Sequence, residues 1–496
     1  DVVGYHLTKD IIFGSRPRPI LLQMALVSMQ LGWSNASGRV AVRAVASAAV
    51  TSFFGLFTVW YLRRQSLQAL ARAKFRRCTD KEVLAGVQEV RRRYHLSETG
   101  GFLPDSCLER LPAEFDAWEA VAADLPQLNR SKALAQRVEA LPVLTAALQG
   151  ASNKVLQRAY ILLGSLVHSY VHREEVPWHC LDGTGEVDTM TRSERKTVPR
   201  ALAEPYLEVC KVLGMPPVLT SAATDLWNWQ RIDPGLPFEP GNLKQRISVT
   251  GTTSERVFHM VPCAMQAAAS EVVPKIFLAD VLIKGARQEE LASLLWEVAE
   301  VLRGFKRLFA LIPKGVDPDV FYKVYRPLLN GFHPDGVNMK MVSPENYEGI
   351  TGLKLESSGL LNSCKGPSAG QSSIILLLDI FLSVSHVKAG TAFQDEMLMY
   401  MPAEHRQLIL DFRARWQAVG SISDFVKKSC QEKGETQELH EAYNASVEAL
   451  LDLRRFHLAT VKRYLVRTSK GTGATTWRML LQAMLDATHA SLLRLS

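Results

Sequence analysis

Cysteine is scarce in this sequence and never occurs in closely spaced pairs. The seven cysteines among 496 residues are scattered, and none forms a CxxC pair. This pattern argues against a disulfide framework and against a zinc knuckle, and it predicts a reducing compartment for the folded body. The chain also lacks the G-x-G-x-x-G, GKS/GKT and HExxH motifs, so no dinucleotide fingerprint, phosphate loop or zinc protease is indicated.

Acidic residues are few in the first 90 residues. This segment carries twelve Lys and Arg against five Asp and Glu, so it holds most of the chain's net charge of +8. The rest of the chain is nearly neutral. A nucleic-acid-binding protein would carry basic residues on its folded body, interleaved with aromatic side chains. We therefore expect no nucleic-acid partner.

An uncharged run of 19 residues, AVASAAVTSFFGLFTVWYL, occupies positions 44–62 of this basic segment. Its length is near the lower limit for a membrane-spanning helix, and Trp60 and Tyr61 lie at one end, where an aromatic belt would place them. A buried helix, or a targeting segment that is later removed, is the alternative. We expect residues 1–90 to form a basic extension that anchors or targets a cytoplasmic body, with 63–90 as a helical linker.

Most of the remaining sequence has the periodicity of helices. Apolar residues recur at 3.6-residue spacing over 113–125, 132–148, 154–171, 202–213, 255–279, 288–309, 318–329, 372–387 and 437–466. Residues 173–199 and 331–371 are expected to be loops, and the proline-rich 232–251 a connector. The pattern predicts an all-α, two-lobed protein with a small helical domain at 91–245 and a larger helical domain at 246–496.

One histidine lies on the apolar face of the C-terminal predicted helix. His457 shares helical spacing with Leu453, Val461 and Tyr464. A neutral imidazole on a rigid helix can provide one axial nitrogen to a haem iron. A lone histidine on an apolar face is more often a satisfied core residue, so the surrounding motifs decide between the two interpretations.

Short motifs run in order through the body. They are RALAEPY at 200–206, LGMPP at 213–217, DPDVF at 317–321, LNGF at 329–332, SAGQSS at 368–373, YMP at 400–402, LRRFH at 453–457 and GTG at 471–473. Each is weak alone, but eight in register argue against chance. Together they resemble the indoleamine 2,3-dioxygenase family over roughly residues 91–496. The resemblance implies a two-lobed helical fold that carries haem b, one per chain, in its larger lobe.

The resemblance also implies which residues hold the haem. His457 would be the proximal iron ligand. Asp379 and Arg454 match an ion pair beside that ligand, whose role is either electronic tuning or holding two helices together. Ser368 and Ala369 match a loop over the haem edge.

A second set of matching residues would bind the substrate. Phe258 and Phe321 match aromatic side chains that wall the indole ring. Arg326 matches the residue that binds the substrate carboxylate, although a surface cation near a helix end is the alternative. Thr472 and Gly473 match a mobile turn that closes over the amino acid, although such glycine-rich segments are often plain turns.

The sequence departs from the family pattern in and near this pocket. Ser221 stands where the family has an aromatic residue that contacts the indole, and Asp225 is near a position that is normally apolar. Pro262 replaces a small hydroxyl residue and lacks a donor. Pro367 replaces a glycine of the haem-edge loop, and Pro327 follows Arg326 directly. We expect a wider, more polar pocket that binds L-tryptophan weakly and admits ring-hydroxylated substrates.

The resemblance implies a dioxygenase that inserts O2 across the indole C2–C3 bond of L-tryptophan or a related indoleamine to give N-formylkynurenine, in tryptophan catabolism. A monomer is expected. One alternative is a non-catalytic, oxygen-binding, myoglobin-like member of the family. Another is a helical interaction protein that has lost its haem. Arg326 argues against the first, and the retention of His457, Asp379 and Arg454 argues against the second.

Overall fold

The chain divides into two compact units, residues 1–73 and 74–496. The computed structural model describes residues 81–181, 196–332, 336–340, 360–361, 364–432, 437–465 and 476–494. The uncharged run at 44–62 lies outside the described residues, as do Thr472 and Gly473. Within the described residues, no helix is both long and apolar enough to cross a membrane.

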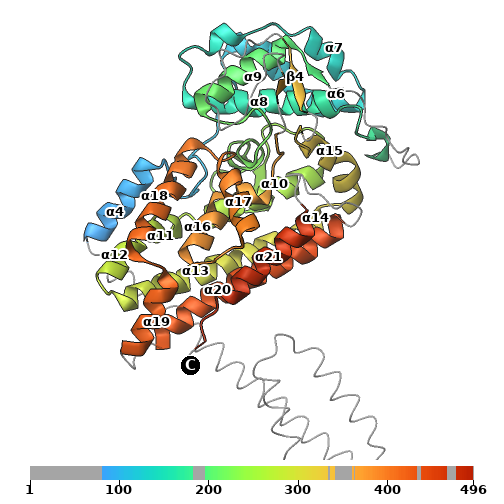
Figure 1. Cartoon of the computed structure of the whole chain (residues 1–496). Coiled ribbons are helices and arrows are strands. Elements are labelled where there is room, and N and C mark those ends of the chain that lie inside the picture. The colour runs from blue at the N-terminus through green and yellow to red at the C-terminus, as the bar shows by residue number, and fades with distance from the viewer. Residues whose placement is uncertain are drawn as a thin grey trace, which may run out of the picture. The chain divides into compact units, whose positions relative to one another are not determined.

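Helices dominate the described part of the chain, which confirms the predicted all-α class (Figure 1). The first group comprises α4 (Lys81–Arg93), α5 (Asp116–Ala123), α6 (Leu125–Arg130), α7 (Leu134–Glu139), α8 (Asn153–His172), α9 (Arg200–Leu213) and the π-helix η4 (Ala222–Leu226). The second group begins with α10 (Thr253–Ala268), α11 (Val272–Phe277), α12 (Ala279–Lys284), α13 (Gln288–Phe309), α14 (Ile312–Gly315), the π-helix η6 (Val320–Tyr325) and α15 (Arg326–Leu329). It ends with α16 (Ser373–Phe381), α17 (Lys388–Leu398), α18 (Ala403–Val419), α19 (Ile422–Glu432), α20 (Gln437–Tyr464) and α21 (Trp477–Ala490).

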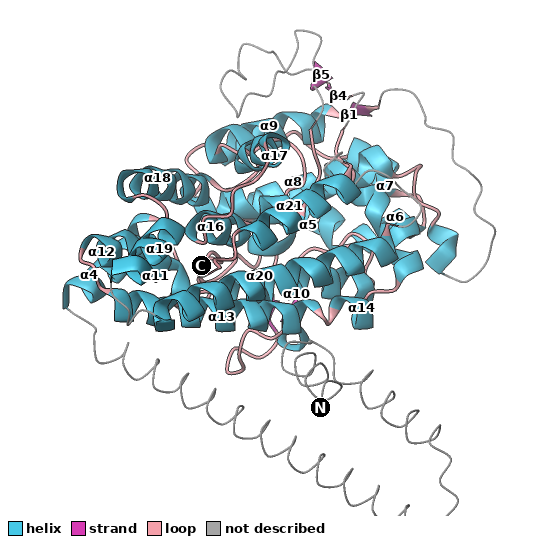
Figure 2. Cartoon of the chain, turned by 60° about the horizontal axis from the view of Figure 1, so that its bottom comes forward, coloured by secondary structure: helices cyan, strands magenta, loops and turns pink. Residues whose placement is uncertain are grey.

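Strands are short and few among the described residues (Figure 2). In one sheet, β4 (Val337–Met339) pairs in parallel with β1 (Thr197–Val198) and antiparallel with β5 (Leu360–Leu361). A second sheet pairs β2 (Gln230–Arg231) with β3 (Leu243–Lys244). Short 3-10 turns complete the secondary structure at Ala113–Phe115, Thr145–Leu148, Trp178–Leu181, Pro240–Asn242 and Ala369–Gln371.

Buried apolar side chains form two clusters. The first joins α5–α9 with η4, η6, α15 and most of α10, and Trp118, Tyr160 and Tyr206 are fully buried in it. The second joins α4, α11–α13, α16 and α18–α20. Helix α13 packs along α20, so the helix that carries His457 has a long buried partner. Helix α4 packs with the second cluster. The division into lobes at 91–245 and 246–496 stays a prediction.

Helix positions follow the sequence pattern closely where the apolar spacing is unbroken. The predicted 288–309 coincides with α13, and the predicted 154–171 and 437–466 match α8 and α20 within two residues at each end. The apolar face that defines each of these helices is also the face that packs against a neighbour.

Four predicted helices are shorter or interrupted. The predicted 113–125 begins with a 3-10 turn and its α-helix ends at Ala123, while 132–148 is helical only over α7 and one short turn. The predicted 255–279 breaks into three helices, and 372–387 ends at Phe381. Ser383 adopts a φ of 55°, which an α-helix does not allow. These breaks leave the apolar spacing almost intact, which is why periodicity misses them.

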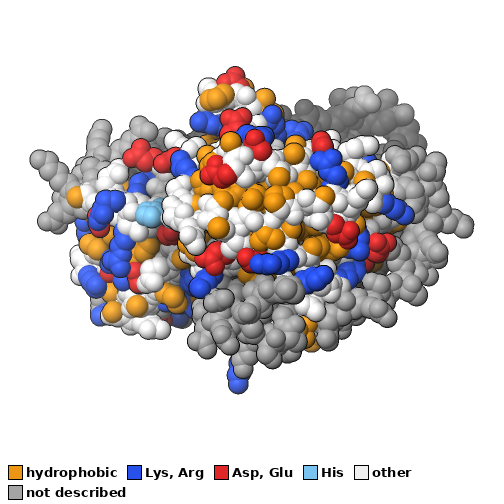
Figure 3. Space-filling model, turned by 90° about the horizontal axis from the view of Figure 1, so that it is seen from above, with side chains coloured by type: hydrophobic (Ala, Val, Ile, Leu, Met, Phe, Trp, Pro, Cys, Tyr) orange, Lys and Arg blue, Asp and Glu red, His pale blue; other side chains and the backbone are white. Residues whose placement is uncertain are grey.

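The face of the molecule above α6–α9 carries both signs of charge (Figure 3). Apolar side chains form a band across its middle. Lysine and arginine side chains alternate with aspartate and glutamate around that band. The visible surface is therefore of mixed charge rather than basic.

A buried histidine, His168, joins α8 to α15 and to the segment that precedes η4. The N–H of Leu219 donates to His168 Nε2 at 2.9 Å, and His168 Nδ1 lies 3.0 Å from the carbonyl oxygen of Leu328. Since Nε2 accepts, Nδ1 carries the proton and donates to Leu328. Burial, with a smaller contribution from His172, lowers the pKa of His168 to about 3.

We expect this histidine to make the fold labile to acid. The folded pKa lies below the ordinary value of 6.5, so the unfolded chain takes up the proton first as the pH falls. The stability is complete above about pH 6.5 and is lost as the pH falls toward 3. Thermal unfolding between pH 7.5 and 4.5 should show a shallower fall in Tm for His168→Gln than for the unchanged protein. The exposed His489→Gln is the control, and an equal slope for all three proteins would contradict this assignment.

Candidate haem and substrate site

His457 lies two turns before the C-terminal end of α20, a helix whose earlier part belongs to the second cluster. Its ring meets the ring of Phe309 on α13 at 5.5 Å between centroids, nearly edge to face. Burial, together with the nearby Arg454 guanidinium, lowers the pKa of His457 to about 4. None of the residues that the structure describes hydrogen-bonds to either ring nitrogen. The imidazole is therefore neutral at physiological pH and has a nitrogen available as a ligand.

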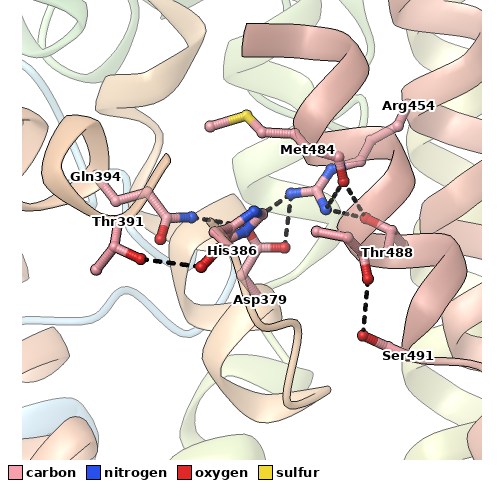
Figure 4. A network of polar contacts seen from close by, with 9 residues as sticks. Asp379, His386, Thr391, Gln394, Arg454, Met484, Thr488 and Ser491 are labelled. Atoms are coloured by element: carbon pink, nitrogen blue, oxygen red, sulfur yellow. Dashed lines mark hydrogen bonds and ion pairs between the residues drawn. The ribbon is translucent and has the colours of Figure 1, made fainter. Parts of the chain in front are cut away.

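A buried polar network lies one helical turn before His457 (Figure 4). The Nη2 atom of Arg454 lies 2.6 and 2.7 Å from the two carboxylate oxygens of Asp379 on α16. His386 Nε2 and Gln394 Nε2 also lie close to the carboxylate, at 3.0 and 2.8 Å from Oδ2. Arg454 donates further to the hydroxyl of Thr488 on α21. The predicted pair is thus the centre of a network that joins four helices.

The network keeps the Asp379 carboxylate charged inside the protein. Its side chain is only 3% exposed, and that of Arg454 is 11% exposed. Burial alone would raise the pKa of Asp379, but the contacts with Arg454 and His386 outweigh burial and hold this pKa below its ordinary value. The sequence did not reveal His386 or Gln394 as partners, because the helix predicted over 372–387 ends at Phe381, and the contacts of the residues that follow are set by the tertiary fold.

The predicted aromatic residues Phe258 and Phe321 are in contact. Their ring centroids are 4.8 Å apart with a tilt of 41°, and Phe321 also meets the ring of Tyr464 at 5.5 Å. Tyr464 lies on α20, two turns beyond His457. The same helix therefore carries the candidate iron ligand and one side of the aromatic wall.

Local sequence fixes the start of α10, which carries Phe258. The Thr252 hydroxyl accepts the N–H of Glu255 at 3.2 Å, and the Glu255 carboxylate accepts the N–H groups of Val249 and Thr250 at 2.8 and 2.7 Å. This is a capping arrangement. The helix continues through Pro262 to Ala268. Because proline has no N–H, the carbonyl of Phe258 receives no helical hydrogen bond from it.

Arg326 follows the π-helix η6 directly. The predicted helix start is confirmed, since Asp317 Oδ1 accepts the N–H groups of Asp319 and Val320 at 2.8 and 2.9 Å. The following Pro327 lies in the first turn of α15, where a proline is tolerated. The Arg326 guanidinium is partly buried, 5.9 Å from the centre of the Tyr322 ring. Burial lowers the pKa of Arg326, and Tyr322 opposes that shift.

The loop that contains Ser368 and Ala369 leads to Gln371, which contacts Ser221 at the start of η4. The Ser368 hydroxyl accepts the N–H of Gly370, and Ala369 is exposed. The buried Gln371 accepts the Ser221 N–H at 2.8 Å, and the Ser221 hydroxyl donates to the Gln371 carbonyl at 3.3 Å. Gln371 is a further residue that the motif contained but that the prediction did not single out.

A hydrogen bond that the sequence did not predict joins Asp225 to His259, the residue after Phe258. His259 Nδ1 lies 2.5 Å from Asp225 Oδ1, and His259 Nε2 contacts the Tyr325 hydroxyl. Tyr325 is buried next to Arg326, and burial raises its pKa well above the ordinary value. Asp225, which departs from the family pattern, therefore has a specific hydrogen-bond partner, His259.

These features suit the haem group that the motifs imply. Among the described residues, no group of three or more His, Cys, Asp or Glu side chains could hold a metal ion by itself. A single neutral histidine would be enough to hold an iron whose remaining nitrogen ligands come from a porphyrin. The donor set at His457 therefore fits haem. The assigned roles of the individual site residues stay predictions.

Comparisons with known proteins agree with the motifs. A family model described as indoleamine 2,3-dioxygenase matches residues 90–491. The chain is 32% identical over 430 residues to indoleamine 2,3-dioxygenase 1 of Rattus norvegicus, which covers 82% of this chain and 97% of the relative. It is 30% identical to indoleamine 2,3-dioxygenase 2 of Homo sapiens, over 81% of this chain and 95% of the relative.

A third relative is a 6-hydroxytryptophan 2,3-dioxygenase of Fusarium equiseti. It is 29% identical to the chain, over 76% of this chain and 86% of the relative. The family model spans all of the motifs and every described helix except the first part of α4. The chain therefore belongs to the indoleamine 2,3-dioxygenase family of haem-dependent oxidoreductases.

Proposed function

We propose that this protein is a haem dioxygenase that cleaves the indole C2–C3 bond of L-tryptophan or a related indoleamine and yields N-formylkynurenine. The observation that carries the proposal is the joint placement of a neutral His457 and the Phe258–Phe321 pair, linked through α20 by Tyr464. When bound, haem would supply the activation of dioxygen and the insertion of both oxygen atoms.

The protein's own residues would bind and orient the substrate. Phe258 and Phe321 offer aromatic surface to the indole ring and exclude water from it. The Arg326 guanidinium would donate hydrogen bonds to the substrate carboxylate. Closure of the turn that contains Thr472 and Gly473 would complete the pocket. Orientation of this kind lowers the entropy cost of reaching the reactive geometry.

The polar network beside His457 would hold the ligand helix in place. Arg454 is tied to Asp379 on α16 and to Thr488 on α21, so α20 is fixed one turn from the iron ligand. Loss of one member of a buried ion pair typically costs about 3–5 kcal/mol. The network would also limit rotation of α20 and so keep the imidazole directed at the iron.

We further propose one haem b per chain, a monomer, and a cytoplasmic body whose residues 1–90 anchor or target it. The decisive test of the activity is analysis of the products formed by the reduced, haem-loaded protein with L-tryptophan and oxygen. Formation of N-formylkynurenine supports the proposal. Stable, reversible oxygen binding without product would favour the oxygen-carrier alternative.

His457→Ala should abolish stoichiometric haem binding and leave the helical content largely unchanged, because only the iron ligand is removed. Haem titration followed by absorbance, with far-UV circular dichroism, measures both quantities. His440→Ala on the same helix is the control and should still bind haem. If His457→Ala kept the spectrum of a histidine-ligated haem, attention would turn to His259 and His386.

Arg326→Met should weaken L-tryptophan binding about tenfold to a hundredfold, since a hydrogen bond to a charged group contributes about 1.5–3 kcal/mol. Tryptamine, which lacks the carboxylate, should bind almost as before. Lys323→Met removes a charge one turn earlier and serves as the control. Equal losses for the two ligands would show that Arg326 is structural.

Ser221→Tyr should lower the KM for L-tryptophan. An added aromatic surface of roughly 40 Å² at ~25 cal/mol per Å² corresponds to about 1 kcal/mol, or about fivefold. Steady-state kinetics with L-tryptophan and with 5-hydroxytryptophan measure the effect, and the hydroxylated substrate should gain less. An unchanged KM for L-tryptophan would refute the wider-pocket interpretation.

A further inference from the structure

A hydrogen-bonded chain of three side chains crosses the interior beside the aromatic wall. It runs from Asp225 through His259 to Tyr325. His259 is 2% exposed and Tyr325 is 1% exposed, while the Asp225 side chain is 16% exposed. Three polar groups at such depth require mutual hydrogen bonds, because an unpaired buried polar group is costly.

The direction of the chain follows from the protonation of its members. Burial, together with the charges of Glu255 and Asp225, raises the pKa of Tyr325, so its hydroxyl stays protonated. This hydroxyl donates a hydrogen bond to His259 Nε2. Because His259 Nε2 accepts this hydrogen bond, it carries no hydrogen, and Nδ1 is the ring nitrogen that does. His259 Nδ1 donates that hydrogen to Asp225 Oδ1 at 2.5 Å. Every donor in the chain therefore meets an acceptor.

Each member of the chain comes from a different element of the pocket. Asp225 lies on η4, one turn after Ser221, and His259 lies on α10, directly after Phe258. Tyr325 closes η6, directly before Arg326. The chain thus connects the three segments that carry the proposed substrate contacts. Two of them, η4 and η6, are π-helical turns, which are uncommon in proteins and often occur at functional sites.

The chain also packs against the aromatic wall itself. The Phe258 ring stands edge to face with the rings of His259 and Tyr325, at 5.2 and 6.1 Å between centroids. The Phe321 ring meets Tyr325 at 6.4 Å. A change in the position of His259 or Tyr325 would therefore move both the aromatic wall and the backbone next to Arg326.

We propose that the Asp225–His259–Tyr325 chain is a positioning device that sets the distance between the aromatic wall at Phe258 and the carboxylate anchor at Arg326. It thereby selects indole amino acids over indoles that lack the carboxylate. This inference rests on the function proposed above. The three residues are positioning residues, because they act through Phe258 and Arg326.

The test compares the dissociation constants of L-tryptophan and tryptamine for the full-length haem-loaded protein, measured by spectral titration without oxygen. Tyr325→Phe removes one hydroxyl and should weaken L-tryptophan binding about five- to tenfold, with tryptamine changed less than twofold. Asp225→Leu should have the same selective effect. Asp225→Asn keeps an acceptor for the His259 Nδ1–H and should restore L-tryptophan affinity to within about twofold of the unchanged protein.

Tyr443→Phe is the matched control. The Tyr443 hydroxyl is buried and donates to the Leu382 carbonyl at 2.9 Å, but Tyr443 precedes His457 by about 21 Å along α20 at ~1.5 Å per residue. The Tyr443→Phe variant should lose thermal stability as Tyr325→Phe does. Its ratio of the dissociation constants for L-tryptophan and tryptamine should stay the same as in the unsubstituted protein.

Three outcomes would overturn the inference. Equal weakening of both ligands by Tyr325→Phe, no change with either ligand, or failure of Asp225→Asn to restore binding would each show that the chain is only structural. If Tyr325→Phe does not fold, the contrast between Asp225→Leu and Asp225→Asn decides. If the unsubstituted protein binds tryptamine as tightly as L-tryptophan, that result would instead refute the proposed carboxylate anchor, and with it the proposed function.

Discussion

The buried carboxylate of Asp379 is the constraint on which the arrangement of helices around His457 depends. A charge that is almost fully removed from water must be compensated, and Arg454, His386 and Gln394 all donate to it. These donors come from α20, from α17 and from the connection before α17, and α21 adds a further contact to Arg454. Helices that are distant in sequence are therefore held around the helix that carries His457.

Different interactions hold the two sides of the candidate site. Ionic and charge-assisted contacts fix the helices behind His457. On the proposed substrate side, Phe258 and Phe321 pack on each other and on the His259–Tyr325 pair, and His259 is held by a hydrogen bond to the Asp225 carboxylate. These contacts suit the proposed pocket, which would receive an indole ring on one side and a carboxylate on the other.

The residues that depart from the family pattern are accommodated by local contacts, without a change of fold. Asp225 has a histidine partner, and Ser221 is tied to Gln371. Pro262 interrupts one hydrogen bond of α10 without ending the helix, and Pro327 lies in a first turn. The polar groups in the altered wall are thus satisfied within the protein. A change of substrate preference is compatible with such a wall, because its aromatic pair is retained.

The sequence by itself determined the helical class, the positions of the long helices, and the identities of His457, Asp379, Arg454, Phe258, Phe321 and Arg326 as candidates. The helices depend on periodicity, which is a local property of the chain. The candidate residues depend on the resemblance of short motifs to the indoleamine 2,3-dioxygenase family. Only the tertiary structure showed that His386 and Gln394 complete the Asp379 network, that Gln371 holds Ser221, and that Asp225, His259 and Tyr325 form one chain. These pairings join residues from separate elements, and side-chain contacts between distant segments are decided by packing, which no single segment encodes.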